Sequence, residues 1–594
     1  MSELATEIDA IRRREIHLTG PYPAPDPDGL RVVLLSPYGH AYSLLATGMQ
    51  ALYEKINRDA RVPAHAERAH VYDCLTRDGN RLSTPDGEPL RTIENPAPVA
   101  DADLLGIGVT NAGALHTVLG LLDLAGIPRR CADRSQGRHP LLIGGSGGLA
   151  NPEPLADYLD IVALGDAEES LAALIRLLHG HRGAPREQVL TKAAQIPGLY
   201  VPQLYEADLL PGGGLTRIRP RTPAAPASVR AQHLPVHALG RAHFASTISD
   251  GTCSVLVPTF GCKHSCRFCT LGTPDFRQAP LATLIEAVDT LEERGIRQII
   301  ISSPTFTQFR HRGKLLDRIR QYADRSPEPV TTIIGSVRAD EVSGDYLDQV
   351  ASLGDFGHLF TELNLAPSRG ILTIAPESAA PDLVRILGKT MDAARVNRAI
   401  DLCHERPEFT TVMLYFIVGI PGETQADRLA IADYALDIHQ RLGRTDGQVI
   451  VKVQQFMPKP TTPSQRLEMA DPDLVEGWND AIRERLRSLA GTELYERSFR
   501  VQWGETSRLL LEAVCLRGDR RVGHVLEDLH DADVDLSRIT RPQLSAALAA
   551  HGLDFSQHLR DMAGEVLPWD IVNTVDPAAE QDLAERLTER AATR

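Results

Sequence analysis

The stretch GCKHSCRFCTLG, residues 261–272, holds three cysteines in the spacing C-x3-C-x2-C, namely Cys262, Cys266 and Cys269. It follows the apolar run CSVLVPTF, residues 253–260, which we expect to be a strand. A structural zinc site usually takes four ligands in two close pairs, whereas three thiolates on one short loop suit a [4Fe–4S] cluster with one iron left open. The stretch therefore predicts an iron–sulfur site, with zinc or an accidental spacing as the alternatives.

The residues after this loop continue a strand–helix series. Five further apolar runs are typical of buried strands, and helical patterns follow all but the last: RQIIIS, TTIIGSV, GILTIAP, VMLYFIVGI and VIVKVQQF. Six such units predict an incomplete parallel (β/α)6 barrel over residues 241–463. Residues 464–594 are helical in pattern and rich in Arg and Glu, with ELYERSFRVQW as a candidate strand. We expect them to form a mainly helical C-terminal domain.

A second α/β series precedes the loop. Four short apolar runs that end in turn signals alternate with helical patterns: RVVLLSP, DLLGIGVT, PLLIGGSGG and DIVALGDAEES. Short buried strands that alternate with helices predict a parallel, Rossmann-like domain over residues 31–218. Ligands on such sheets bind outside the carboxyl ends of the strands. Residues 1–30 are then an N-terminal extension, and the Pro- and Ala-rich residues 219–240 are a linker.

The composition excludes several classes of protein. The formal net charge of the 594 residues is −15, and the arginines are scattered, whereas a nucleic-acid-binding protein needs a basic face. No run approaches the roughly 18 apolar residues of a membrane helix. The first residues are polar and charged, without the apolar core of a signal peptide. We therefore expect a cytoplasmic protein with no nucleic-acid or membrane partner.

Several motifs resemble the radical S-adenosylmethionine (SAM) superfamily. CKHSCRFC resembles its signature loop, and later segments resemble its cobalamin-dependent branch: TIAPES at 373–378, LGK at 387–389, FIVGIPGET at 416–424 and FMPKPTTPSQ at 456–465. The segment GGSGGLANPEPLADYLDIVALGDAEES, residues 144–170, resembles the cobalamin-binding domain that precedes the barrel in that branch. The resemblance extends over about residues 31–465, and the motifs follow the expected order.

The resemblance implies three cofactors, namely the [4Fe–4S] cluster held by the three cysteines, SAM on the open iron, and cobalamin on the first domain. The positions that match the surroundings of SAM are Ser336, Arg338, Glu377, Gly419 and Gly422. Those that match the frame of the corrin and its nucleotide tail are Ser36, Pro37, Tyr38, Thr110, Asn111, Gly144, Gly145, Ser146 and Gly147. The alternatives are an ion pair between Glu377 and a barrel arginine, a plain strand-to-helix turn at GIPGE, and a phosphate site at the Gly-rich loop.

The lower face of the cobalt departs from a common pattern. Many cobalamin proteins carry D-x-H-x-x-G, which this sequence lacks, and His116 has neither the Asp nor the spacing. We therefore expect no histidine on the cobalt. Arg68 matches the position of an arginine in related enzymes, and a guanidinium has no free lone pair with which to ligate. It would disfavour a further ligand there; the alternative is a surface arginine paired with Glu67 or Asp73.

The resemblance implies methyl transfer from SAM through methylcobalamin to a carbon acceptor, with an electron donor that reduces cobalamin. Within the family, the chain resembles the tryptophan 2-C-methyltransferases of thiostrepton-type thiopeptide biosynthesis, which implies C2 of L-tryptophan as the acceptor. Glu286 is the candidate carboxylate near the open iron, with a solvated helical glutamate as the alternative, and Tyr415 is a candidate general base. Three other functions remain open: radical methylation of an sp3 carbon, a ring-forming cyclase, and a cofactor-sensing module without catalysis.

Overall fold

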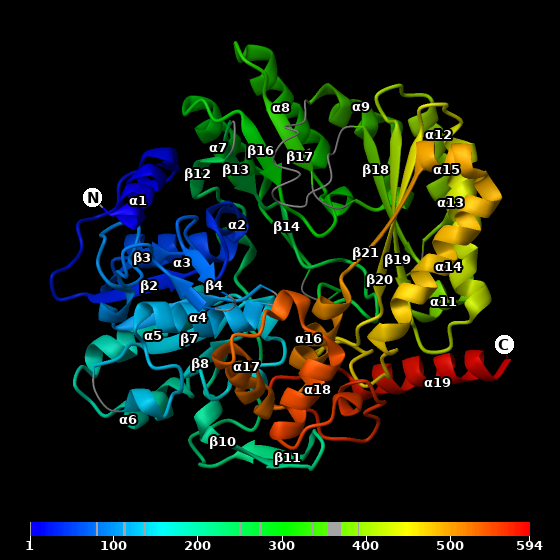
Figure 1. Cartoon of the computed structure of the whole chain (residues 1–594). Helices are drawn as coiled ribbons and strands as arrows, with labels where there is room; N and C mark the ends of the chain where they lie inside the picture. The colour runs from blue at the N-terminus through cyan, green and yellow to red at the C-terminus, as the bar shows by residue number, and fades with distance from the viewer. Residues whose placement is uncertain are drawn as a thin grey trace. The chain divides into compact units, whose positions relative to one another are not determined.

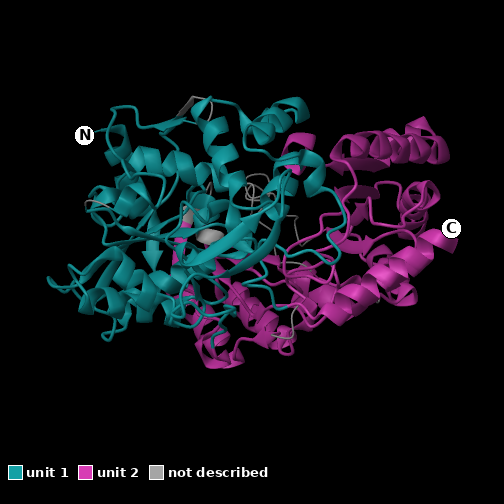
Figure 2. Cartoon of the chain, turned by 90° about the horizontal axis from the view of Figure 1, so that it is seen from below, with its two compact units in different colours: residues 1–234, 510–574 teal, residues 235–509, 575–594 magenta. Residues whose placement is uncertain are grey.

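The computed structural model describes residues 2–593 apart from 79–80, 111–113, 136–137, 249–250, 273–275, 335–336, 354–369 and 390. Contacts divide the chain into two compact units, coloured separately in Figure 2. Unit 1 comprises residues 1–234 and 510–574, and unit 2 comprises residues 235–509 and 575–594. Each unit is therefore assembled from two separate stretches of the chain.

Unit 1 is built on a six-stranded sheet in the order β3-β2-β6-β7-β8-β9, in which only β9 is antiparallel to its neighbour among the described pairs. The strands are β2 (Leu30–Leu35), β3 (Ala64–Ala69), β6 (Leu104–Gly108), β7 (Leu141–Gly145), β8 (Ile161–Ala163) and β9 (Leu199–Tyr200). Their apolar residues are buried, as strands covered on both faces require. This flavodoxin-like order puts the topological switch point between β2 and β6, where α/β sheets bind ligands.

Helices join these strands (Figure 1). They are α2 (His40–Leu45), α3 (Thr47–Arg58), α4 (Leu115–Ala125), α5 (Glu168–Gly180) and α6 (Arg186–Ala193). The N-terminal extension contributes α1 (Glu3–Arg14) and β1 (Glu15–His17), and two hairpins complete the first stretch: β4 (Thr76–Asp78) with β5 (Arg81–Ser83), and β10 (Tyr205–Leu209) with β11 (Leu215–Pro220). The predicted Rossmann-like sheet is confirmed.

The second stretch of unit 1 contains α17 (Arg521–Asp531), α18 (Arg541–Ala550) and most of α16 (Thr506–Arg517). It binds the segment after β7 through buried polar groups. The Asn151 amide donates to the Gly518 carbonyl at 2.8 Å, and Arg520 pairs with the buried Glu153 at 2.9 Å. We expected one C-terminal domain over residues 464–594, but these contacts place residues 510–574 in the N-terminal unit.

Unit 2 contains the six strands expected for the barrel, in two parallel groups. The first group is β13 (Gly251–Leu256), β16 (Gln298–Ile301) and β17 (Thr331–Ile334), and β12 (Phe244–Ile248) adds an antiparallel strand that we did not predict. The second group is β18 (Ile371–Glu377), β19 (Thr411–Val418) and β20 (Gln448–Gln455). The candidate strand in ELYERSFRVQW is β21 (Phe499–Trp503), which pairs parallel to β20. The predicted α/β class with parallel barrel strands is confirmed.

The helices of unit 2 are α7 (Leu281–Glu293), α8 (Arg312–Arg325), α9 (Gly344–Ser352), α11 (Pro381–Ile386), α12 (Ala393–His404), α13 (Gln425–Leu442), α14 (Pro472–Ala490), α15 (Thr492–Ser498) and α19 (Pro577–Thr593). A capping box starts α13, because the Thr424 hydroxyl accepts from the Asp427 amide while the Asp427 carboxylate accepts from the Thr424 amide. Within the described ranges, none of the helices has the length and apolar character needed to cross a bilayer.

Candidate cofactor-binding site

The cysteine loop lies after β13 and between two short strands, β14 (Thr259–Phe260) and β15 (Arg277–Gln278). Backbone hydrogen bonds fold it onto itself: the Cys262 amide donates to the Leu271 carbonyl at 2.9 Å, and the Cys269 amide donates to the Cys266 carbonyl at 3.1 Å. All three cysteines are free and half-buried. The thiols are therefore held on one compact loop and remain open to a ligand.

Charge around the thiols also bears on metal binding. Burial raises the pKa of Cys266 to about 11, and the nearby Lys389 cation opposes this shift while the other two cysteines add to it. No three His, Cys, Asp or Glu side chains converge on a single ion in the described part of the chain. Because a [4Fe–4S] cluster carries its thiolates on different irons, the sulfurs need not converge on one point. Three thiols on one short loop suit a cluster with one iron left open.

The cysteine loop is attached to the segment that follows β18. The Arg267 amide donates to the Leu387 carbonyl at 2.9 Å, and a Cβ on Gly388 would lie 3.0 Å from the Ser265 carbonyl oxygen. Gly388 also has a φ of +74°, which glycine adopts without strain. The LGK motif therefore provides a turn that lets the two segments approach closely.

Glu377 ends β18 in a strained conformation, since its φ is +67° although it is not glycine. Its carboxylate is buried and pairs with Lys389 at 2.5 Å. Burial raises its pKa, and Lys389 opposes the rise. The alternative expectation for Glu377 was an ion pair with a barrel arginine. Its partner is instead Lys389, the last residue of the LGK motif.

The GIPGE segment forms a tight turn between β19 and α13. Gly419 and Gly422 have φ values of +80° and +77°. The buried Glu423 carboxylate accepts from the Gly419 amide at 2.7 Å and pairs with Arg428 at 3.3 Å. Burial raises the pKa of Glu423 to about 7. Of the other positions expected around SAM, Arg338 pairs with Asp340 at 2.9 Å, and Ser336 falls outside the described residues.

The two candidate catalytic residues of unit 2 lie on regular elements. Glu286 is exposed on α7, the placement that the solvated-glutamate alternative predicts. Tyr415 is half-buried on β19, and its ring lies 5.5 Å from the Lys452 amino group. Within the described ranges, neither side chain has a hydrogen bond or ion pair with the cysteine loop, and both roles stay predictions.

In unit 1, the loops after β2 and β6 meet at the switch point. The Thr110 amide and hydroxyl lie 3.1 and 2.7 Å from the Tyr38 hydroxyl. Ser146 follows β7 with a φ of +92°, a conformation that non-glycine residues rarely adopt. The neighbouring Asn111 falls outside the described residues.

Two buried polar atoms at this edge of the sheet have no hydrogen-bond partner among the described residues. They are the Ser36 hydroxyl, which follows β2, and Nε2 of His70, which follows β3. The Ser36 amide donates to the carbonyl of Ala69, so the two residues end neighbouring strands. Such orphaned groups are rare in proteins and fit an edge that holds a polar ligand. The sequence analysis did not consider His70, for which no motif gave a signal.

The glycines of the loop after β7 serve different purposes. A Cβ on Gly144 would lie 2.5 Å from a methyl of Leu159 and 2.9 Å from one of Leu149. Gly144 is therefore needed for core packing, whereas we expected it to admit a ligand. A Cβ on Gly145 or Gly147 would make only ordinary van der Waals contacts, the closest being 3.6 Å to the Ala163 carbonyl oxygen and 3.7 Å to the Thr110 carbonyl oxygen, respectively.

Arg68 lies on β3 and is mostly buried. Its guanidinium pairs with Glu15 and with Glu94, both at 2.6 Å, and stacks over Tyr53 at 4.9 Å. Neither of the expected partners is used in these pairs. Glu67 instead pairs with Arg31 at 2.7 Å. Two carboxylates thus neutralise the cation, and a role beneath a corrin stays a prediction.

Two family models match parts of both units. Residues 48–202 match the family described as Radical SAM proteins, N-terminal, and residues 256–435 match the Radical SAM superfamily. The chain contains a radical SAM domain. This domain includes the cysteine loop, Glu377 and the GIPGE turn, and it confirms the superfamily that the loop predicted.

The curated relatives of the chain are distant. It is 21% identical over 250 residues to a threonylcarbamoyladenosine tRNA methylthiotransferase of Thermotoga maritima, a match over 41% of this chain and 53% of that protein. It is 24% identical over 346 residues to a ribosomal protein uS12 methylthiotransferase of Paracoccus denitrificans, over 55% and 64% of the two chains. The chain spans about half the length of the first relatives it matches.

The solved structures that match the chain include two radical SAM enzymes. The methyltransferase TsrM of Kitasatospora setae, with tryptophan and a SAM analogue bound, is 16% identical and has a TM-score of 0.45 over 71% of this chain and 73% of that one. The cobalamin-dependent enzyme OxsB, with cobalamin and SAM bound, is 13% identical and has a TM-score of 0.47 over 95% and 84%.

Proposed function

We propose that the chain is a cobalamin- and [4Fe–4S]-dependent methyltransferase that moves a methyl group from SAM to a carbon acceptor. The preferred acceptor is C2 of L-tryptophan, in thiopeptide antibiotic biosynthesis. The observation that carries the proposal is the three-thiol loop inside a radical SAM domain, bonded through Arg267 to the LGK turn, which presents Lys389 to Glu377. The motif resemblance of residues 31–465 supports the cobalamin branch.

In unit 2 the chain's own groups would bind and orient two cofactors. Cys262, Cys266 and Cys269 would hold the cluster, and the Lys389 cation favours the thiolate of Cys266 over its thiol. Glu377, whose strained backbone fixes the carboxylate at the strand end, would accept hydrogen bonds from a ribose hydroxyl or an ammonium group of SAM. The cofactors supply the methyl group and the cobalt that carries it.

In unit 1 the carboxyl edge of the sheet would hold the corrin. The Ser36 hydroxyl and His70 Nε2 are orphaned there, and the Tyr38–Thr110 contact defines the surface at the switch point. Cobalamin side chains carry amides, which would satisfy such groups. An indole carbon is already nucleophilic, so Tyr415 or another base needs only to take the proton that leaves C2, and an external electron donor keeps the cofactor reduced.

The test is anaerobic reconstitution with iron, sulfide and cobalamin, followed by incubation with L-tryptophan and SAM deuterated in its methyl group. We expect 2-methyltryptophan that carries the label, identified by mass spectrometry and by comparison with a synthetic standard. Reconstituted protein with neither an iron–sulfur spectrum nor bound corrinoid would refute the proposal. If the protein binds both the cluster and the corrinoid but tryptophan stays unlabelled, only the assignment of tryptophan as the acceptor would be refuted.

A second candidate is methylthio transfer, which the curated relatives favour because the matches named above are methylthiotransferases. The same products distinguish it, since a methylthio group adds sulfur as well as the labelled methyl. Radical methylation of an sp3 carbon would release 5′-deoxyadenosine, and a cyclase would form a product without the labelled methyl group. A sensing module would give no product.

A further inference from the structure

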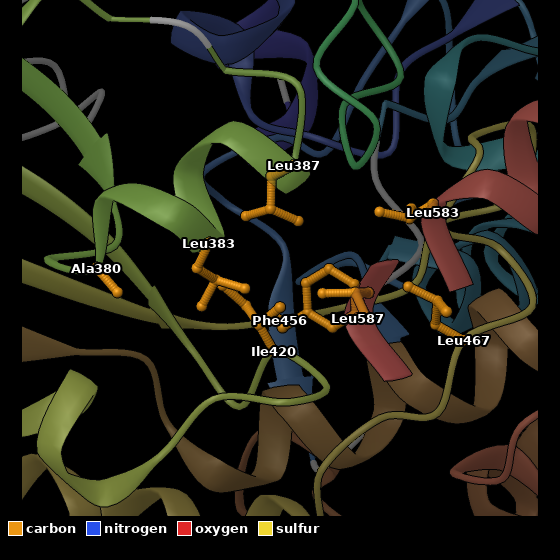
Figure 3. Close-up of a cluster of buried hydrophobic side chains, with 8 residues drawn as sticks. All are labelled: Ala380, Leu383, Leu387, Ile420, Phe456, Leu467, Leu583 and Leu587. Carbon is orange, nitrogen blue, oxygen red and sulfur yellow. The ribbon is translucent and has the colours of Figure 1, made fainter. Parts of the chain in front are cut away.

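The C-terminal helix α19 lies against the radical SAM domain of unit 2 through an apolar cluster. Leu583 and Leu587 of α19 are buried there. The side chains that meet them come from α11 and its flanks, from the ends of β19 and β20, and from the segment before α14: Ala380, Leu383, Leu387, Ile420, Phe456 and Leu467. Figure 3 shows Leu583 and Leu587 of α19 and Leu383 of α11 gathered around Phe456. Phe268 of the cysteine loop packs against the same cluster.

A buried arginine of α19 ties the helix to the GIPGE turn. The Arg590 side chain is 3% exposed and pairs with Asp382 and with Asp427, each at 2.9 Å. It also donates to the Gly422 carbonyl. Asp427 closes the capping box of α13, so one cation binds both the turn and the helix that follows it. Charge-assisted bonds of this kind are short and directional, and they fix geometry.

The backbone of α19 also touches the turn directly. A Cβ on Gly422 would lie 2.9 Å from the carbonyl oxygen of Leu587, a distance at which one of the two backbones has to move. Glycine at position 422 therefore permits both the positive φ and the close approach of the helix. The turn and α19 are thus packed backbone against backbone at Gly422.

The first turns of α19 contact the cysteine loop. Asp582 pairs at 2.6 Å with Arg267, the residue that follows Cys266 in the chain. Glu580 pairs at 2.8 Å with Arg466, beside the FMPKPTTPSQ motif, and Ser464 of that motif donates its amide to the Arg267 carbonyl. The helix thus contacts the cysteine loop near one end and the GIPGE turn near the other.

We infer that α19 is a positioning element for the cofactor site, with Arg590 as the positioning residue that holds the GIPGE turn in the conformation that binds SAM. The inference rests on the proposed function in assigning SAM to this turn. Arg590 acts through Gly422 and Asp427 and does not itself reach the cofactor. Nothing in the sequence of residues 575–594 indicates this role, since the segment reads as an ordinary charged helix.

The first test needs no cofactor and measures amide hydrogen exchange in the full chain. Arg590→Met removes the cation but keeps an unbranched apolar stem, and Arg590→Lys keeps the charge. Arg586→Met is the matched control, because it makes the same change at an exposed position of α19 whose ion pair with Asp582 contributes little. We expect the amide exchange rate of residues 419–424 to rise about tenfold or more in Arg590→Met and to stay near the parent rate in Arg586→Met. In Arg590→Lys the rate should lie closer to the parent rate than it does in Arg590→Met.

The second test measures SAM binding by the anaerobically loaded protein and the change that SAM causes in the electron paramagnetic resonance spectrum of the reduced cluster. We expect Kd for SAM to rise about tenfold in Arg590→Met at unchanged iron content, with partial recovery in Arg590→Lys. If Arg590→Met does not fold, Asp382→Asn weakens the same network and takes its place. Parent-like exchange and Kd in a folded variant would overturn the inference. Failure of the unmutated protein to bind SAM would refute the proposed function, while the exchange result would still decide whether α19 holds the turn.

Discussion

Replacement of Gly422 by alanine should destabilise unit 2 by two separable effects. At a φ of +77° an alanine costs about 1–2 kcal/mol, because its Cβ crowds the backbone in the left-handed region. The added Cβ would also lie 2.9 Å from the Leu587 carbonyl, and overpacking against backbone costs about 1–3 kcal/mol. The expected loss is thus about 2–5 kcal/mol in the free energy of unfolding.

The control is Gly295→Ala, which shares the positive φ, +68°, but has nothing within 4 Å of its added Cβ. It should lose only the conformational part, about 1–2 kcal/mol. Urea unfolding followed by tryptophan fluorescence suits the comparison, since Trp478 and Trp503 lie in unit 2. Equal losses in the two variants would show that α19 does not press on Gly422, and the reasoning about that contact would be wrong.

Three further outcomes follow from the site and the fold. Cys266→Ala should lose most of the iron bound on anaerobic reconstitution, whereas Cys403→Ala, at a buried cysteine far from the loop in sequence, should retain it; equal iron contents would contradict the cluster assignment. Because burial raises the pKa of Glu423 from 4.5 to about 7, the folded state binds more protons than the unfolded state between these pH values, and the free energy of unfolding should fall as pH rises through this window. Glu423→Gln should flatten the dependence of the free energy of unfolding on pH. An unchanged pH dependence in this variant would refute the role of Glu423. Arg520→Met leaves Glu153 buried without its cation and should lower the free energy of unfolding of unit 1 by about 3–5 kcal/mol, measured by thermal or urea unfolding. A decrease below about 1 kcal/mol would contradict this prediction.

Local patterns in the sequence were sufficient for the sheets and for the cysteine loop. Each buried parallel strand is a short apolar run between turn residues, so its position can be found without knowledge of its partners. The strand at Phe499–Trp503 was found in the same way. The cysteine spacing is equally local, and the family match to residues 256–435 agrees with it.

Long-range partners could not be predicted from such patterns. Arg590 and Asp382 are 208 residues apart, and Glu153 and Arg520 are 367 residues apart. The ion-pair partners considered for Arg68, Glu67 and Asp73, are neighbours in the sequence, and a geometric reason explains why Glu67 does not pair with it. Successive side chains of a strand point to opposite faces of the sheet, so Glu67 faces away from Arg68, whose partners Glu15 and Glu94 come from other segments.

The division of each unit into two stretches has a consequence for synthesis on the ribosome. The sheet of unit 1 emerges first, yet Asn151 and Glu153 wait for partners near residue 520, and unit 2 waits for Arg590 at the far end of the chain. Neither unit can finish folding as the nascent polypeptide emerges. Binding of the proposed cofactors would thereby be deferred until residues near Arg590 have been synthesised, and a product that stops before α19 would lack the pairing of Asp582 with the cysteine loop.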